Sequence, residues 1–243
     1  STAPKSVWAE LPDPGIPDRG PAVLPNMSTQ NIVIFGGTGY AGGHIAAQAV
    51  KRGHHVTSYS RSGAPAEPVD GVTYETGSLA DSATVEQAAR DADVIVVAVH
   101  GADVDGKPLV ELVPEITRAA IAHNARLGVV GGAGSALVSD GGPRLVDTPD
   151  FHDDWKPEAL SHAKVLEALR TSPDELDWFY VSPAALFGSF APGEATGSYR
   201  TGGDLLVTKE DGSSEISGAD FALAFVDEID EPKHRRQRFT TGH

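Results

Sequence analysis

Three glycines at Gly36, Gly39 and Gly42 separate an apolar segment from an amphipathic one. Residues 31–35 before them predict a strand, and residues 44–52 after them predict a helix. Glycines between a strand and a helix let the backbone approach a pyrophosphate, and the first helical turn offers amides that lack partners within the helix. The pattern predicts a dinucleotide-binding site. The alternative is a turn with a purely structural role. Contacts to the cofactor are assigned to Gly36, Thr38, Gly39, Tyr40, Ala41 and Gly42.

The end of the second predicted strand, at residues 55–60, bears on which dinucleotide would bind. A carboxylate at this point would hold the ribose hydroxyls of NAD, but the sequence places Ser60 and Arg61 there. An arginine can pair with the 2′-phosphate of NADP, which a carboxylate would repel. We therefore expect NADP(H) to be preferred, with Ser60 and Arg61 as contacts. NAD(H) is the alternative if Arg61 is only a solvated loop cation.

The elements that must position these residues alternate along the chain. Short apolar runs at 31–35, 55–60, 72–75, 93–99, 127–130 and 178–181 predict strands, and a further strand is expected at 205–208. Helical periods are expected at 44–52, 83–90, 109–120, 157–170 and 218–229. This alternation predicts an α/β fold, a Rossmann-type doubly wound parallel sheet with a small C-terminal substrate lobe.

The first 28 residues differ in composition, with six prolines and no apolar periodicity. We expect residues 1–28 to be a proline-rich extension and residues 29–243 to form the NAD(P)-binding domain. The alternative is that apolar side chains of the extension pack on a protein partner or on a second copy of the chain, as in a homo-oligomer.

Composition excludes several classes of function. The formal net charge of −15 argues against a nucleic-acid partner, so a phosphate would need a local binding device. The chain has no cysteine, which fits a cytoplasmic protein and excludes thiolate chemistry. No apolar run is long enough to span a membrane, and no histidine pair has the spacing of a helical metal site. The basic cluster at 234–238 is interpreted as a solvated face.

The glycine turn resembles that of the atypical short-chain dehydrogenase/reductase family, in its NmrA-like and flavin- and biliverdin-reductase-like branch. Further likeness lies in Gly77-Ser78-Leu79, in Ser182 to Leu186 and in Ile216 to Ala222, which keeps Asp220. The resemblance implies that Ser78 and Leu79 contact adenine. It assigns further cofactor contacts to Ala98, Val99, Gly132, Lys164 and Pro183.

The resemblance also implies candidates for catalysis. Typical members use a Tyr-x-x-x-Lys pair, but the matching helix here has Leu160 and Lys164, so the usual proton donor is missing. Lys164 would then hold the nicotinamide ribose, Ser135 would polarise the substrate, and His100 is a candidate proton carrier. Residues expected to shape the substrate pocket, or else to be ordinary loop residues, are His152, Asp153, Asp154, Trp155 and Tyr199.

These features predict an NAD(P)H-dependent oxidoreductase that passes hydride to a quinone, a flavin-like molecule or a carbonyl compound. Two alternatives remain. One is a non-catalytic NADP(H)-binding redox sensor or regulator, and the other is an NAD-dependent epimerase-like enzyme.

Overall fold

One mostly parallel sheet forms the centre of the protein, whose computed structural model describes residues 28–243. The strand order is β3-β2-β1-β4-β5-β6-β8-β7, and only the β7–β8 pair is antiparallel. The strands are β1 (Asn31–Phe35), β2 (His55–Ser60), β3 (Val72–Thr76), β4 (Val94–Val97), β5 (Arg126–Val130), β6 (Trp178–Ser182), β7 (Arg200–Thr201) and β8 (Gln237–Gly242). The order reverses between β1 and β4, which is where open α/β sheets bind ligands.

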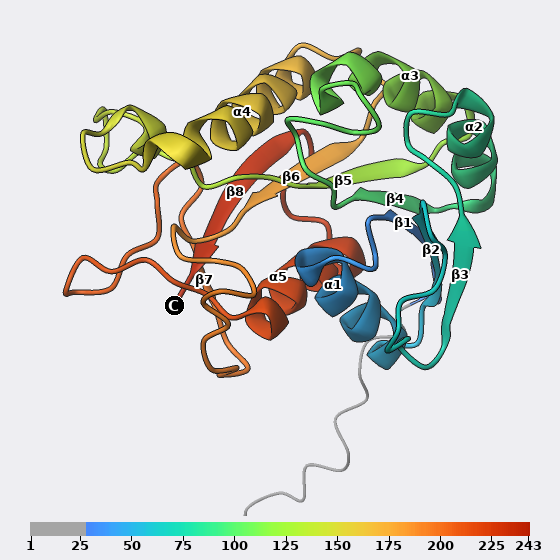
Figure 1. Ribbon diagram of the computed structural model, residues 1–243, viewed down its shortest axis with the longest axis horizontal. Helices are drawn as coiled ribbons and strands as arrows, with labels where there is room; N and C mark the ends of the chain where they lie inside the picture. Colours follow the sequence, from blue (N-terminus) through green and yellow to red (C-terminus); the bar gives the residue numbers. More distant parts are fainter. Residues whose placement is uncertain (1–27) are drawn as a thin grey trace, which may run out of the picture.

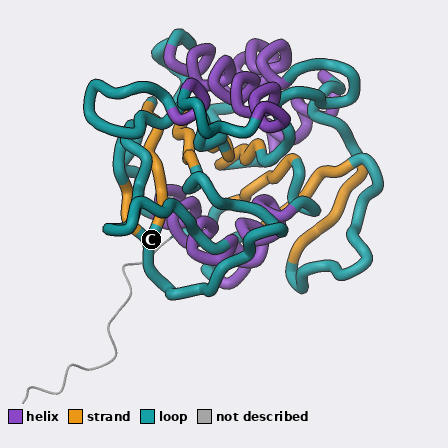
Figure 2. Tube along the Cα trace, turned by 60° about the vertical axis from the view of Figure 1, so that its left-hand side comes forward, coloured by secondary structure: helices purple, strands orange, loops and turns teal. Residues whose placement is uncertain are grey.

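Helices cover both faces of this sheet. They are α1 (Tyr40–Lys51), α2 (Ser82–Asp91), α3 (Leu109–Ala122), α4 (Lys156–Arg170) and α5 (Gly218–Asp230), with short 3-10 turns at Leu145–Asp147 and Asp153–Trp155. Helices α2, α3 and α4 lie on one face, and α1 and α5 lie on the other (Figures 1 and 2). The predicted α/β, Rossmann-type doubly wound fold is confirmed.

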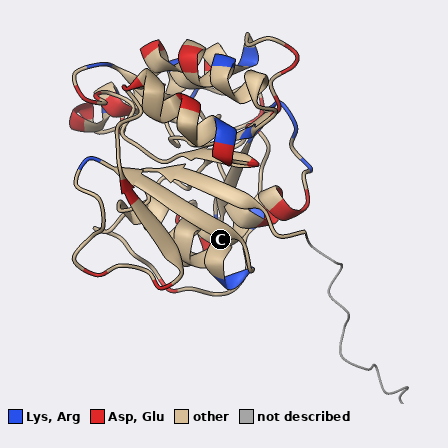
Figure 3. Cartoon of the chain, turned by 90° about the vertical axis from the view of Figure 1, so that its right-hand side faces the viewer, with Lys and Arg blue, Asp and Glu red and all other residues tan. Residues whose placement is uncertain are grey.

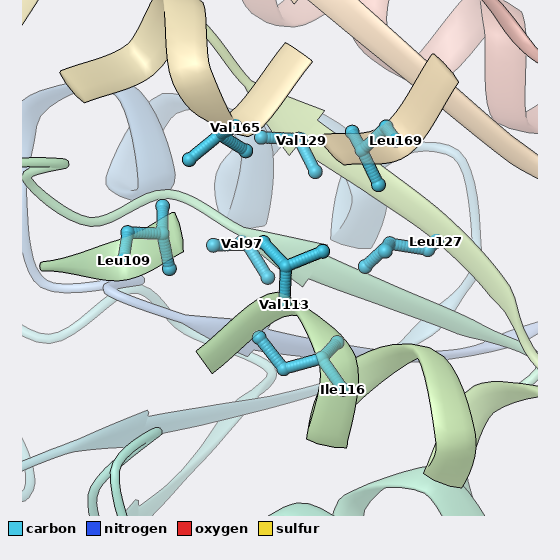
Figure 4. A pocket seen from close by; sticks show the side chains of 8 residues that line it. All are labelled: Val97, Leu109, Val113, Ile116, Leu127, Val129, Val165 and Leu169. Atoms are coloured by element: carbon cyan, nitrogen blue, oxygen red, sulfur yellow. The ribbon is translucent and has the colours of Figure 1, made fainter. Parts of the chain in front are cut away.

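Double coverage explains why the central strands are apolar throughout. Every residue of β4, β5 and β6 is buried, as expected for strands with helices on both faces. One core joins the sheet to α2, α3 and α4, and a second core joins it to α1 and α5. The first core leaves a small apolar void of about 10 Å³. Figure 4 shows the side chains around it, namely Val97, Leu109, Val113, Ile116, Leu127, Val129, Val165 and Leu169.

Charged side chains lie mainly on the outer helices and loops, and the strands are almost free of them (Figure 3). One ion pair is an exception. Arg126 at the start of β5 pairs with Glu228 of α5 at 2.7 Å, with side-chain exposures of 8% and 3%. The His234 side chain and two backbone amides also donate to Glu228. The charge of this buried carboxylate is therefore well compensated.

Two predicted features near the C-terminal end are wrong. Residues 205–208 are not a strand, since Leu205 forms only an isolated bridge with Leu137. The basic cluster at 234–238 is not a solvated face, because β8 begins within it and Arg238 is buried. Arg238 can be buried because its guanidinium pairs with Asp204 and donates to the Ser135 and Ser182 hydroxyls.

The proline-rich extension predicted at 1–28 lies, except for its last residue, outside the described residues. Within residues 28–243, no helix is both long enough and apolar enough to cross a membrane.

Candidate cofactor cleft and active site

A cleft of about 1140 Å³ lies beyond the carboxyl ends of the strands. Its lining comes from the glycine turn, the ends of β2 and β3, the segments after β4, β5 and β6, and the start of α4. We refer to it below as the cofactor cleft. Its position above the β1–β4 reversal is the usual ligand site of this architecture.

Two positions of the glycine turn, Gly36 and Gly42, have no room for a side chain. Gly36 has a φ of +89°, and a Cβ there would lie 2.2 Å from the Ala98 carbonyl oxygen. A Cβ on Gly42 would lie 2.1 Å from the Gly36 carbonyl oxygen, so α1 packs directly against the turn. Helix α1 begins after Gly39, and no side chain caps its free amides. These amides are therefore available to an anionic group in the cleft.

One end of the cleft carries the residues predicted to meet the adenosine. Ser60, Arg61, Ser78 and Leu79 all line it. The Arg61 side chain is 81% exposed, and its Nη1 lies 3.2 Å from a carboxylate oxygen of Asp105. Asp105 also accepts a hydrogen bond from the Ser78 hydroxyl. A carboxylate therefore stands beside the arginine that we expected to meet a 2′-phosphate.

The floor of the cleft follows β5 as Gly131, Gly132, Ala133 and Gly134. Tyr180 of β6 holds this segment, since its hydroxyl accepts from the Gly132 amide at 3.2 Å and donates to the His162 carbonyl at 3.1 Å. Burial raises the pKa of Tyr180 to about 12. This phenol is thus a structural bridge between the floor and α4.

Glu158 of α4 joins two histidines at the cleft. Its carboxylate lies 3.0 Å from His162 Nε2 and 3.5 Å from His100 Nδ1. Burial alone would raise the pKa of Glu158, but hydrogen bonds from His162 and from the amides of Gly101 and Ala102 outweigh it and lower the pKa to about 2. The His100 side chain is 91% exposed. A fixed anion therefore stands behind an imidazole that is open to the cleft.

Four rings form the outer part of the cleft, and we call them the aromatic wall: Phe151, His152, Trp155 and Phe190. Trp155 and Phe190 are 51% and 68% exposed, with ring centroids 6.3 Å apart. Trp155 also lies 5.3 Å from the His152 ring. Large apolar side chains left open inside a concave site are typical of a site that binds a flat apolar ligand.

Most of the predicted site residues are brought together. The cleft is lined by the predicted contacts Gly36, Thr38, Gly39, Tyr40, Ala41, Ser60, Arg61, Ser78, Leu79, Ala98, Val99, Gly132 and Pro183, and by His100. Gly42 lies beneath the turn and supports it. His152, Asp154 and Trp155 also line the cleft, as expected.

Two of the three predicted catalytic residues lie outside the cleft. Lys164 is exposed on the outer face of α4, because the helix turns Glu158, Ala159 and His162 toward the cleft. Ser135 is held away from it by Arg238, whose Nη1 donates to the Ser135 hydroxyl at 3.0 Å. Neither residue lines the cleft in this structure, where the resemblance implied that both would lie.

Two residues expected to shape the pocket also lie elsewhere. Tyr199 donates to Asp227 at 2.7 Å, and Asp153 pairs with Lys156 at the surface. Conversely, four residues of the cleft were not predicted from the sequence: Glu158, His162, Asp105 and Phe190. The Glu158-x-x-x-His162 spacing and the Asp105-Gly106 turn were signals that could have found three of them.

The residues present fit a nicotinamide dinucleotide. The uncapped start of α1 suits a pyrophosphate, and Gly36 and Gly39 add no side chain to the turn that such a group would approach. Within residues 28–243, no group of three or more His, Asp or Glu side chains could hold a metal ion.

Comparison with known proteins agrees with this geometry. The chain matches the NAD(P)H-binding family over residues 36–232. It is 34% identical over 220 residues to the uncharacterized protein YwnB of Bacillus subtilis, covering 86% of this chain and 96% of that protein.

Solved structures give the same result. A protein from Streptococcus pneumoniae with a proposed NADH-flavin reductase activity is 32% identical, with a TM-score of 0.77 over 88% of this chain and 99% of that chain. A proposed epimerase from Bacteroides thetaiotaomicron is 28% identical, with a TM-score of 0.76 over 89% and 98% of the two chains. The resemblance to atypical short-chain dehydrogenases/reductases is confirmed, and the chain belongs to the NAD(P)H-binding family.

Proposed function

We propose that the protein is an NADPH-dependent oxidoreductase that reduces a planar conjugated acceptor, a flavin or a quinone. The observation that carries this proposal is the continuity of one cleft from the glycine turn to the aromatic wall. A cofactor extended over the sheet would have its pyrophosphate at α1 and its adenosine near Arg61. Its nicotinamide would then lie toward Gly132 and Pro183.

The chain's own groups have distinct tasks in this reaction. The bound nicotinamide supplies a hydride, and the aromatic wall holds the acceptor flat against it by stacking. His100 is the side chain in position to deliver the accompanying proton, and its Nδ1 lies 3.5 Å from the Glu158 carboxylate. A reduced flavin or quinone is stabilised by its own ring system, so a tyrosine acid is not required.

The related protein from Streptococcus pneumoniae, with its proposed NADH-flavin reductase activity, supports the same substrate class. Our preference for NADPH rests on Arg61, which lines the adenosine end of the cleft.

The test is the oxidation rate of NADPH and of NADH by the purified protein with flavins, quinones, aldehydes and ketones. We expect turnover with flavins or quinones and faster turnover with NADPH. Turnover confined to simple ketones would contradict the acceptor class. Tight NADPH binding without turnover on any acceptor would instead favour the non-catalytic redox sensor.

A further inference from the structure

A short hairpin after β4 brings a carboxylate to the adenosine end of the cofactor cleft. Val104 and Lys107 pair across it, with backbone hydrogen bonds of 2.7 and 3.2 Å. Its two tip residues, Asp105 and Gly106, have positive φ values of 51° and 87°, as a tight two-residue hairpin requires. Asp103 accepts from the Gly106 amide at 2.7 Å and closes the turn. Hydrogen bonds within the hairpin therefore fix the conformation of its tip.

The tip carboxylate touches the groups that would surround an adenosine ribose. Asp105 lies 3.2 Å from Arg61 and accepts from the Ser78 hydroxyl. The Ser78 oxygen accepts in turn from the Ala80 amide at 3.0 Å, which fixes its direction. All three side chains line the cleft, and the Asp105 side chain is 28% exposed. Asp105 is thus held at this position from two sides.

We propose that Asp105 is a specificity-determining residue, which weakens binding of a 2′-phosphate and accepts hydrogen bonds from an unmodified ribose. The inference rests on the proposed function, since it assumes that the adenosine of a nicotinamide dinucleotide lies at Arg61. A 2′-phosphate that approaches Arg61 meets the like charge of Asp105 and must displace its hydrogen bonds. A 2′-hydroxyl meets an acceptor instead. The carboxylate that other dinucleotide folds place at the end of β2 is here supplied by a different loop.

The test is Asp105→Asn, followed by isothermal titration calorimetry with NADPH and NADH. Asparagine adopts positive φ readily, so the hairpin is retained, and its side-chain oxygen still accepts from a hydroxyl. The substitution should affect the two cofactors to different extents. We expect NADPH to bind roughly tenfold more tightly, from removal of one nearby like charge, and NADH to change by less than about threefold. Adenosine 2′,5′-bisphosphate and AMP should show the same contrast without nicotinamide.

Asp103→Asn is the matched control, because it removes the same charge from the same hairpin and keeps the acceptor for the Gly106 amide. It should alter the NADPH affinity less than about twofold, since Asp103 does not contact Arg61. In an Arg61→Ala background, Asp105→Asn should increase the NADPH affinity much less than it does in the unmodified protein.

Two failures can be told apart. If the unmodified protein binds neither dinucleotide, the proposed function is overturned and this inference falls with it. If it binds both and Asp105→Asn leaves their affinity ratio unchanged, or if Asp103→Asn has an equal effect, only the role of Asp105 is refuted.

Discussion

Gly42 and Gly43 are adjacent in the first turn of α1, but a methyl group would have opposite effects at the two positions. At Gly42 the new Cβ would lie 2.1 Å from the Gly36 carbonyl oxygen and 2.7 Å from its carbonyl carbon, both backbone atoms. Ordinary contact begins at 3.4 Å, so turn and helix would have to separate by roughly 1 Å. At Gly43 the nearest neighbour is the Gly37 oxygen at 3.5 Å, which needs no movement.

These distances set the expected stabilities. Overpacking costs about 1–3 kcal/mol, and replacing a helical glycine by alanine returns about 0.5–1 kcal/mol. Gly42→Ala should therefore lower the free energy of unfolding by up to about 2.5 kcal/mol and the Tm by up to about 8 °C. Gly43→Ala should raise the free energy of unfolding by about 0.5–1 kcal/mol.

The assay is urea denaturation of both variants, with NADPH titration on the folded proteins. Gly42→Ala should also weaken NADPH binding, because separating α1 from the turn moves the free amides that face the phosphate. The reasoning is refuted if Gly42→Ala is as stable as Gly43→Ala and binds NADPH equally well.

Three further predictions concern the rest of the site and the core. The pKa of Glu158 is lowered from 4.5 to about 2 in the folded state, so the stability it provides is complete above pH 4.5 and is lost as the pH falls toward 2. Glu158→Gln should flatten the fall of Tm with pH in that window, and an unchanged pH profile would contradict this. Arg126→Met should lower the free energy of unfolding, measured by urea denaturation, by about 3 kcal/mol, because it leaves Glu228 buried with fewer hydrogen-bond donors. A decrease below about 1 kcal/mol would show that the ion pair is dispensable. Trp155→Ala should raise the KM for a flavin or quinone about tenfold, the worth of one aromatic stack, and leave the Kd for NADPH unchanged. A loss of NADPH affinity instead would place the aromatic wall against the cofactor.

Local sequence patterns were sufficient to predict the features whose signal lies within one element or one turn. The strand, glycine turn and helix at the start of the fold occupy about 20 consecutive residues, and each part limits the next. The uninterrupted apolar run of β4 is likewise typical of a strand with helices on both faces. These elements also located the cleft, because the carboxyl ends of parallel strands meet at one edge.

Contacts between distant segments could not be predicted in this way. Strand β8 carries Arg238, and its pairing with β6 and the contact to Asp204 help to explain how this arginine can be buried. Assigning Lys164 to the cleft failed for a different reason. A Tyr-x-x-x-Lys match gives the spacing of two residues on a helix but not which face points inward, and the packing of α4 against the sheet selects Glu158 and His162.

The Tyr180 hydroxyl has a mechanical consequence. It binds the Gly132 amide and the His162 carbonyl at once, so the cleft floor and α4 are tied to the same buried ring. When a ligand enters, these two parts must move as one body, because separating them would leave polar groups unpaired in the interior. We therefore expect the cleft to widen at lining loops outside this pair, such as residues 103–107 and 183–190. Amide hydrogen exchange should accordingly be slow at Gly132 and should respond to ligand in those two loops.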